Sequence, residues 1–176
     1  MISEIRQLDN YSSSNITLLT DLSYLIYDFR HELAILKNKG INYTKENAIE
    51  EVKDYLITPY ELYYISINEK TVAYLVLKIF DDTVWIEQLF TLKEHRRKHL
   101  AQKMIDFATK KAETLGKNTA FVNVHPNNEK MLKFLANQGY TVLNLLEIRK
   151  SYPNEKIQTK ITITHKKTNQ SFDFDY

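Results

Sequence analysis

The stretch of the chain that decides the fold is Leu89–Ile105, which reads LFTLKEHRRKHLAQKMI. A short apolar segment leads into a basic loop, and the loop opens directly into an amphipathic helical pattern. The first N–H groups of a helix have no partner within the helix, and the helix dipole favours an anion at that end. The stretch therefore predicts a phosphate-binding loop between a strand and a helix.

This segment resembles the pyrophosphate loop of the GNAT acyltransferases, in which R-x-x-G-x-G/A follows a strand and begins a helix. The pattern falls on residues 96–101, where the arginine and the final small residue match and His99 replaces the usual glycine. The resemblance implies that backbone N–H groups of residues 97–102 hold the pyrophosphate of acetyl-CoA. The cofactor-binding residues that it implies in this loop are Arg96, Arg97, Lys98, His99, Leu100, Ala101 and Gln102. The alternative to cofactor binding, judged only from the positive charge of the loop, is a solvated basic helix start or a small nucleic-acid-binding patch.

A second segment, Asn128–Tyr140, reads NEKMLKFLANQGY and resembles the family helix N-x-x-A-x-x-x-Y, which closes on G-F or G-Y. Asn128 and the closing Gly139-Tyr140 pair match, whereas Leu135 falls where the family has its tyrosine general acid. Asparagine is among the best N-caps, and in the family this residue also faces the cofactor arm. We therefore expect Asn128 to bind the cofactor and Tyr140 to be the candidate proton donor. A thiolate with a pKa of about 8.5 is also a tolerable leaving group without a donor.

The strand before the loop contains Glu87, in a run from Trp85 to Phe90 that looks like the matching strand of the polyamine acetyltransferase branch. An amine with a pKa of about 10 is mostly protonated at pH 7, with roughly one molecule in a few thousand neutral. Glu87 is the candidate general base that would deprotonate it, and a solvent-facing or lysine-paired glutamate is the alternative. The family further implies that the backbone at Leu89, Phe90 and Thr91 pairs with the pantetheine arm and stabilises the oxyanion. The three segments together place the resemblance at about residues 60–148.

The composition predicts one globular domain. A chain of 176 residues is long enough for one core and short for two, so we expect a single acetyltransferase domain over residues 1–176. The net charge of +2 gives no strong attraction to nucleic acid or membrane, and the absence of cysteine excludes thiolate catalysis. The polar start MISEIRQLDN is unlike a signal peptide, so we expect a cytoplasmic protein. His95 and His99 have metal-ligand spacing, but no third ligand is evident and no metal is expected.

Hydrophobic periodicity predicts an α+β fold. Helical spacing covers residues 17–37, 45–56, 96–115 and 128–138, with Thr44 as the N-cap of the second helix and Ala48, Ile49, Val52 and Leu56 facing inward. β-rich runs cover residues 3–8, 61–67, 71–80, 83–91, 119–124, 140–148 and 157–164, with short polar separators that indicate hairpins after 67 and 80. We expect a mixed and mostly antiparallel sheet of six to seven strands with helices on both faces, and the resemblance implies that this is the GNAT fold. The tail from residue 171 to 176 has no assignment.

The resemblance of the three segments implies an N-acetyltransferase that moves an acetyl group from acetyl-CoA to a primary amine. The amine would attack directly in a ternary complex, because no nucleophile constellation is visible for a covalent intermediate. A non-catalytic acyl-CoA-binding module is the alternative, and His99 and Leu135 motivate it. The acceptor stays open among polyamines, aminoglycosides, free amino acids and a protein N-terminus or lysine, in other words a small-molecule or peptide amine. Whether the protein forms a homodimer is also left open, and neither nucleic acid nor membrane is expected as a partner.

Overall fold

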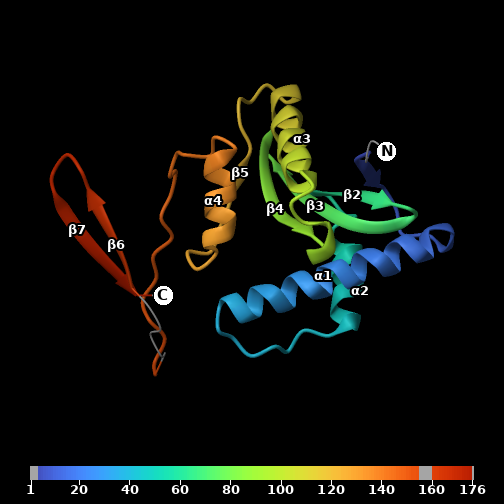
Figure 1. Cartoon of the computed structure of the whole chain (residues 1–176), viewed down its shortest axis with the longest axis horizontal. Helices are drawn as coiled ribbons and strands as arrows, with labels where there is room; N and C mark the ends of the chain where they lie inside the picture. The colour runs from blue at the N-terminus through green and yellow to red at the C-terminus, as the bar shows by residue number, and fades with distance from the viewer. Residues whose placement is uncertain (1–3, 155–159, 176) are drawn as a thin grey trace. The chain divides into compact units, whose positions relative to one another are not determined.

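Three consecutive strands form an antiparallel meander in the computed structural model of the chain, which describes residues 4–154 and 160–175 (Figure 1). The strands are β2 (Tyr60–Ile67), β3 (Lys70–Phe80) and β4 (Thr83–Thr91). Each hairpin turn consists of two residues with positive φ, Asn68-Glu69 and Asp81-Asp82, which is the turn geometry that matches the twist of paired strands. The predicted hairpins are therefore confirmed.

Two short strands complete a five-stranded sheet in the order β1-β2-β3-β4-β5. Strand β1 (Arg6–Leu8) is antiparallel to β2, and β5 (Phe121–Val122) is parallel to β4. A parallel neighbour requires a crossover connection, which α3 (Leu100–Thr114) supplies. The sheet is mixed and mostly antiparallel, as predicted, but β5 is shorter than the strand expected over residues 119–124.

Helices cover both faces of this sheet, which confirms the predicted α+β class (Figure 1). A 3₁₀ turn at Ser13–Asn15 precedes α1 (Ile16–Leu36), and α1 packs with α2 (Lys45–Asp54) on one face. Helices α3 and α4 (Glu129–Asn137) pack on the other face. In the described part of the chain, no helix combines the length and the apolar character that a membrane span needs.

Strand β3 lies at the centre of the core, because the residues from Thr71 to Leu77 are all buried. Alternate side chains of this strand enter two hydrophobic clusters, with Leu75 on the α3 side and Tyr74 on the α1–α2 side. One inward assignment was wrong: Ile49 of α2 is 38% exposed. Its place in the helix turns it away from the sheet, whereas Ala48 and Val52 are fully buried.

The polypeptide divides into two units, residues 1–140 and residues 141–176. In the second unit, β6 (Lys160–His165) and β7 (Gln170–Asp175) form an antiparallel hairpin of their own. Among the described residues the strands therefore form a sheet of five and a sheet of two, in place of the predicted single sheet of six to seven. The strand predicted over residues 140–148 is wrong, since this segment has no regular structure and its residues from 141 on are exposed. An apolar run has strand propensity, but a strand needs a ladder partner. The strand predicted over 157–164 is confirmed from residue 160, and residues 157–159 lie outside the described ranges.

Candidate active site

Strand β4 offers an open backbone edge at its C-terminal half. On one side it pairs with β3 from Thr83 to Thr91, but on the other side β5 pairs with Trp85 and Ile86 alone. From Glu87 onward, no strand in the described ranges pairs with that side of β4. Unpaired N–H and C=O groups along such an edge can take up an added extended chain. The open edge includes Leu89, Phe90 and Thr91, where the family resemblance implied pairing with the pantetheine arm.

The loop after β4 passes through a 3₁₀ turn, η2 (Lys93–His95), and reaches α3 with two residues in the left-handed region. Arg97 has φ of 62°, and His99 at the N-cap has φ of 59°. A left-handed residue cannot continue a right-handed helix, so α3 begins at Leu100 and the helix start predicted at Arg96 is wrong. The His99 ring Nδ1 lies 3.0 Å from Oε1 of Gln102, directly above the first turn of the helix.

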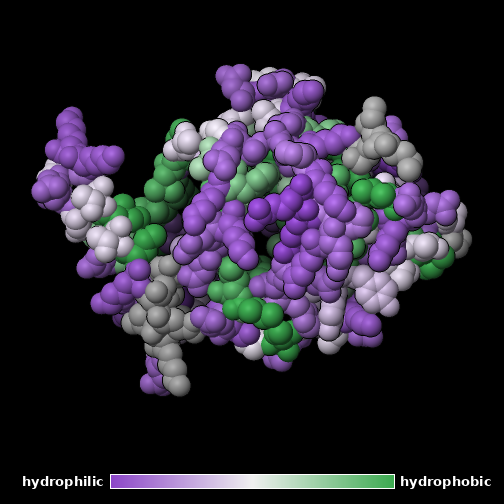
Figure 2. Space-filling view, viewed as in Figure 1, coloured by the Kyte–Doolittle hydropathy of each residue, from purple (hydrophilic) through white to green (hydrophobic). Residues whose placement is uncertain are grey.

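The N-terminus of α3 leaves its first amides available. Lys103 N–H donates to His99 C=O as the first helical bond, so the N–H groups of the preceding residues have no intrahelical acceptor. Such a terminus, in a loop with the exposed side chains of Arg97 and Lys98, is suited to a phosphate group. Figure 2 shows a hollow in this face of the molecule, beside the start of α3 as Figure 1 places it, with mainly hydrophilic residues around it.

Arg96 has contacts within the protein, while the phosphate contact that the resemblance implied for it stays a prediction. Its Nε donates to Thr91 C=O at 2.8 Å, and its NH2 group donates to both carboxylate oxygens of Glu32 at 2.8 and 2.9 Å. The guanidinium also lies over the Phe90 ring, 5.4 Å from the centroid. Arg96 therefore ties the loop and the end of β4 to helix α1.

Thr91 carries one of two buried side-chain atoms that have no hydrogen-bond partner among the described residues, Thr91 Oγ1 and His95 Nδ1. Buried polar atoms nearly always have a partner, and exceptions occur at functional sites. Thr91 is the last residue of β4, so its backbone forms the end of the open edge along which an added extended chain would pair. The residues present thus fit a ligand with hydrogen-bonding groups along its length.

Glu87 is the extra residue of a β-bulge. Gln88 lies opposite Val76, Ile86 lies opposite Leu77, and Glu87 has no counterpart on β3. The Glu87 side chain is exposed, and its charge contributes to the raised pKa of Tyr55, after burial and the interaction with Glu51. Bulges occur next to active sites, where they redirect a side chain. The position is suitable for a carboxylate that meets a ligand at the open edge.

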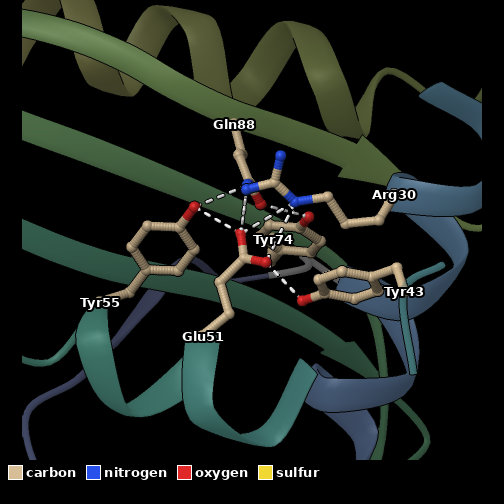
Figure 3. Close-up of polar contacts among 6 residues, drawn as sticks. All are labelled: Arg30, Tyr43, Glu51, Tyr55, Tyr74 and Gln88. Carbon is tan, nitrogen blue, oxygen red and sulfur yellow. Dashed lines mark hydrogen bonds and ion pairs between the residues drawn. The ribbon is translucent and has the colours of Figure 1, made fainter. Parts of the chain in front are cut away.

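A network of polar side chains lies between α1, α2 and the sheet (Figure 3). Glu51 of α2 accepts hydrogen bonds from Arg30, Tyr43, Tyr55 at 2.6 Å and Gln88 at 2.7 Å. We call Arg30, Tyr43, Glu51, Tyr55, Tyr74 and Gln88 the Glu51 network. Sequence reasoning missed this network. The signal was available, because Glu51 lies three residues after Ala48 and one before Val52, on the buried face of the predicted helix.

The network keeps its carboxylate ionised and its phenols neutral. Burial alone would raise the pKa of Glu51, but hydrogen bonds from Arg30, Tyr43 and Tyr55 outweigh it and hold the pKa below the usual value. Burial, together with the hydrogen bonds to Glu51, raises the pKa of Tyr43 and of Tyr55. At neutral pH every phenol in the network therefore carries a proton that it can donate.

Helix α4 places the remaining predicted residues. Asn128 is the N-cap, with Oδ1 accepting from the Met131 N–H at 3.2 Å, which confirms its predicted capping role. Leu135 is 4% exposed and belongs to the core on the α3 side. Tyr140 is half-buried, and its hydroxyl lies 3.3 Å from Thr109 Oγ1 of α3. No contact among the described residues joins Tyr140 to Glu87, so its role as proton donor stays a prediction.

The chain belongs to the acetyltransferase (GNAT) family, whose sequence model matches residues 27–140. That range holds the whole of the site described above, from Arg30 of α1 to Tyr140 after α4. The predicted family membership and fold are therefore confirmed.

Solved acetyltransferase structures share the fold at low sequence identity. AAC(6')-Iy in complex with the bisubstrate analogue CoA-S-monomethyl-acetylneamine is 13% identical, with a TM-score of 0.64, and covers 86% of this chain and 100% of its own. Ribosomal-protein-alanine N-acetyltransferase from Brucella melitensis biovar Abortus 2308 is 14% identical, with a TM-score of 0.66 and the same coverage. The aminoglycoside acetyltransferase meta-AAC0020 from an uncultured soil metagenomic sample is 15% identical, with a TM-score of 0.60, covering 86% and 96%. No curated protein sequence matches the chain as a relative.

Proposed function

We propose that the protein is an N-acetyltransferase that moves an acetyl group from acetyl-CoA to a primary amine. The observation that carries this proposal is the open edge of β4, which runs directly into the loop and N-terminus of α3. An extended amide-containing arm with a diphosphate at one end matches both parts of that arrangement. Two solved structures of the same fold contain CoA or a CoA-based analogue, which supports this choice of cofactor.

The cofactor would lie along residues that run from β4 to α3. Backbone groups of Leu89, Phe90 and Thr91 would pair with the pantetheine arm as an added strand does. The N–H groups of residues 97–102 would hold the pyrophosphate, while Arg97 and Lys98 supply positive charge. Asn128 would face the arm from the start of α4. Arg96 would contribute indirectly, because its hydrogen bonds to Thr91 and Glu32 hold the loop in place.

Bound acetyl-CoA supplies an activated acetyl thioester. Glu87 would take a proton from the acceptor ammonium, which frees the nitrogen lone pair to attack the thioester carbon. A backbone N–H at the open edge of β4 would stabilise the oxyanion that forms. When the C–S bond breaks, the nitrogen would lose its second proton to solvent, and the sulfur would leave as a thiolate or take a proton from a donor such as Tyr140. Direct attack of this kind needs no covalent enzyme intermediate.

The second candidate function is a non-catalytic acyl-CoA-binding module. The burial of Leu135 favours it, because an apolar core residue holds the place of the family's proton donor. The exposed Glu87 at the open edge favours the enzyme, since a binding module has no need of a carboxylate there.

The cofactor test compares two ligands with the same protein. Acetyl-CoA should raise the melting temperature clearly more than ATP at equal concentration, because ATP can use the phosphate site but not the β4 edge. Equal shifts from both would indicate a general anion site and would remove the argument for acetyl-CoA.

The catalytic test uses Glu87→Gln. This variant should lower kcat on an active amine by about 10²-fold at pH 7 and leave acetyl-CoA affinity nearly unchanged. The loss should shrink at high pH, where the amine loses its proton unaided. An unchanged rate at pH 7 would leave Glu87 with no catalytic role.

A further inference from the structure

Gln88 is a buried amide whose polar atoms are all engaged. It is 4% exposed, and its Nε2 donates to Glu51 at 2.7 Å and to the Tyr55 hydroxyl at 2.6 Å. Its Oε1 accepts a hydrogen bond from Tyr74 at 2.8 Å (Figure 3). These partners come from α2 and from β3, so the side chain is fixed from two elements at once.

The bulge at Glu87 follows from the direction of the Gln88 side chain. In a regular strand, residues two apart share a face, so Ile86 and Gln88 would point the same way. Here Ile86 belongs to the core on the α3 side, while Gln88 joins the Glu51 network on the opposite side. One additional residue between them reconciles the two directions, and that residue is Glu87.

Gln88 is the first residue after the bulge, and the buried Leu89 and Phe90 that follow it keep the strand in register beyond it. A full shift of one residue would move both of these side chains to the wrong face of the sheet, so the release of Gln88 would loosen the bulge locally instead. Such loosening would rotate the Glu87 carboxylate along the strand. Fixing Gln88 therefore fixes the backbone from which Glu87 points.

The anchor itself is held by a charge. Glu51 Oε1 accepts from Arg30 as well as from Gln88, Oε2 accepts from Tyr43, and hydrogen bonds to a carboxylate are stronger than neutral ones. A network whose members are all satisfied is rigid, since any movement leaves a buried polar atom unpaired.

We propose that Gln88, held by Glu51, Tyr55 and Tyr74, is a positioning residue that fixes the β4 bulge and thereby orients Glu87 toward the acceptor amine. This inference rests on the proposed role of Glu87 as general base. Gln88 itself does not touch the reacting atoms. Its effect on the reaction runs through Glu87.

A double-mutant cycle tests this coupling. Gln88→Leu should lower kcat about ten- to a hundredfold at pH 7, because a misplacement of about 1 Å costs on the order of 10²-fold. Acetyl-CoA affinity should change by less than about twofold. In a Glu87→Gln background the same Gln88→Leu change should lower kcat by less than about twofold, since no base remains to be misplaced. The loss from Gln88→Leu should also shrink at high pH, in parallel with that of Glu87→Gln.

Two further variants keep the test decisive. Tyr74→Phe removes one hydrogen bond to Gln88 and keeps the ring, so it replaces Gln88→Leu as the test if that variant folds poorly. It should lower kcat by a smaller factor, and this loss should again disappear in the Glu87→Gln background. Ile26→Val, in the same core cluster but outside the network, controls for lowered stability and should leave kcat unchanged.

The outcomes separate the inference from the function on which it rests. Equal fractional losses from Gln88→Leu with and without Glu87, or no loss at all, would overturn the positioning role. A Glu87→Gln variant with the parent's rate would instead overturn the base, and the inference with it. A loss in Ile26→Val as large as that in Gln88→Leu would assign the effect to stability.

Discussion

Replacing His99 by glycine should remove backbone strain at the N-cap of α3. His99 has φ of 59° and ψ of 13°, in the left-handed region that costs a residue with a Cβ about 1–2 kcal/mol. Glycine adopts this region freely but loses more conformational entropy on folding, by about 0.5–1 kcal/mol relative to alanine. The sign of the outcome depends on which of these two effects is larger at this position.

The matched control is His99→Ala, which keeps the strain and, like glycine, loses the ring contact with Gln102. The difference between the two variants isolates the backbone effect. Subtracting the entropic cost from the strain leaves the glycine variant more stable than the alanine variant by up to about 1.5 kcal/mol. In a chain of this length that difference is a shift of up to about 6 °C in melting temperature.

Thermal unfolding followed by circular dichroism measures both variants directly, and acetyl-CoA titration follows. If residue 99 were inside the helix, glycine would be less stable than alanine by about 1 kcal/mol, the opposite sign. A glycine variant that melts below the alanine variant would thus refute the left-handed N-cap. Removal of the side chain should also let a phosphate approach the backbone more closely, so the glycine variant should bind acetyl-CoA more tightly than the parent.

Three other changes follow from the same geometry. Leu135→Tyr should overpack the core and lower the free energy of unfolding by about 1–3 kcal/mol, measured by urea denaturation, and an undiminished stability would show room at that site. Arg96→Ala should weaken acetyl-CoA binding severalfold while costing less than about 1 kcal/mol of stability, because its ion pair with Glu32 is partly exposed, and unchanged binding would contradict its role in holding the loop. The pKa of Glu51 is lower in the folded protein than its value of 4.5 in the unfolded chain. Its ionised carboxylate therefore stabilises the folded state fully when the pH is above 4.5, and this contribution is lost as the pH falls from 4.5 through the pKa of the folded state. Below pH 4.5 the parent should therefore lose stability more steeply than Glu51→Gln in urea denaturation across pH, and parallel curves would exclude this contribution.

Sequence reasoning reached the parts of the fold that depend on local patterns. The hairpins were predictable because short polar separators interrupt long β-rich runs, and the α2 start was predictable because Thr44 is followed three residues later by Asn47, which completes a capping box. Glu87 and Asn128 were found through matched motifs, and the structure places them at an open edge and a helix start.

The rest depends on partners that are distant along the chain. The bulge at Glu87 arises because Gln88 is held by Glu51, Tyr55 and Tyr74, residues that no local pattern links. The contact of Arg96 with Glu32 of α1 joins residues 64 positions apart, so no local pattern predicted it. The segment 140–148 has strand composition, yet composition cannot report whether a ladder partner is present.

The most direct test of the proposed function is acetyl transfer itself. The protein is incubated with acetyl-CoA and a panel of polyamines, aminoglycosides, amino acids and alanine-terminated peptides, and CoA thiol release is followed together with the mass of each amine. The account predicts amine-dependent thiol release, with one acetyl group gained by the amine per thiol and a loss of about 10²-fold in Glu87→Gln. Bound acetyl-CoA with no amine-dependent release across the whole panel would contradict it and would favour the non-catalytic acyl-CoA-binding module.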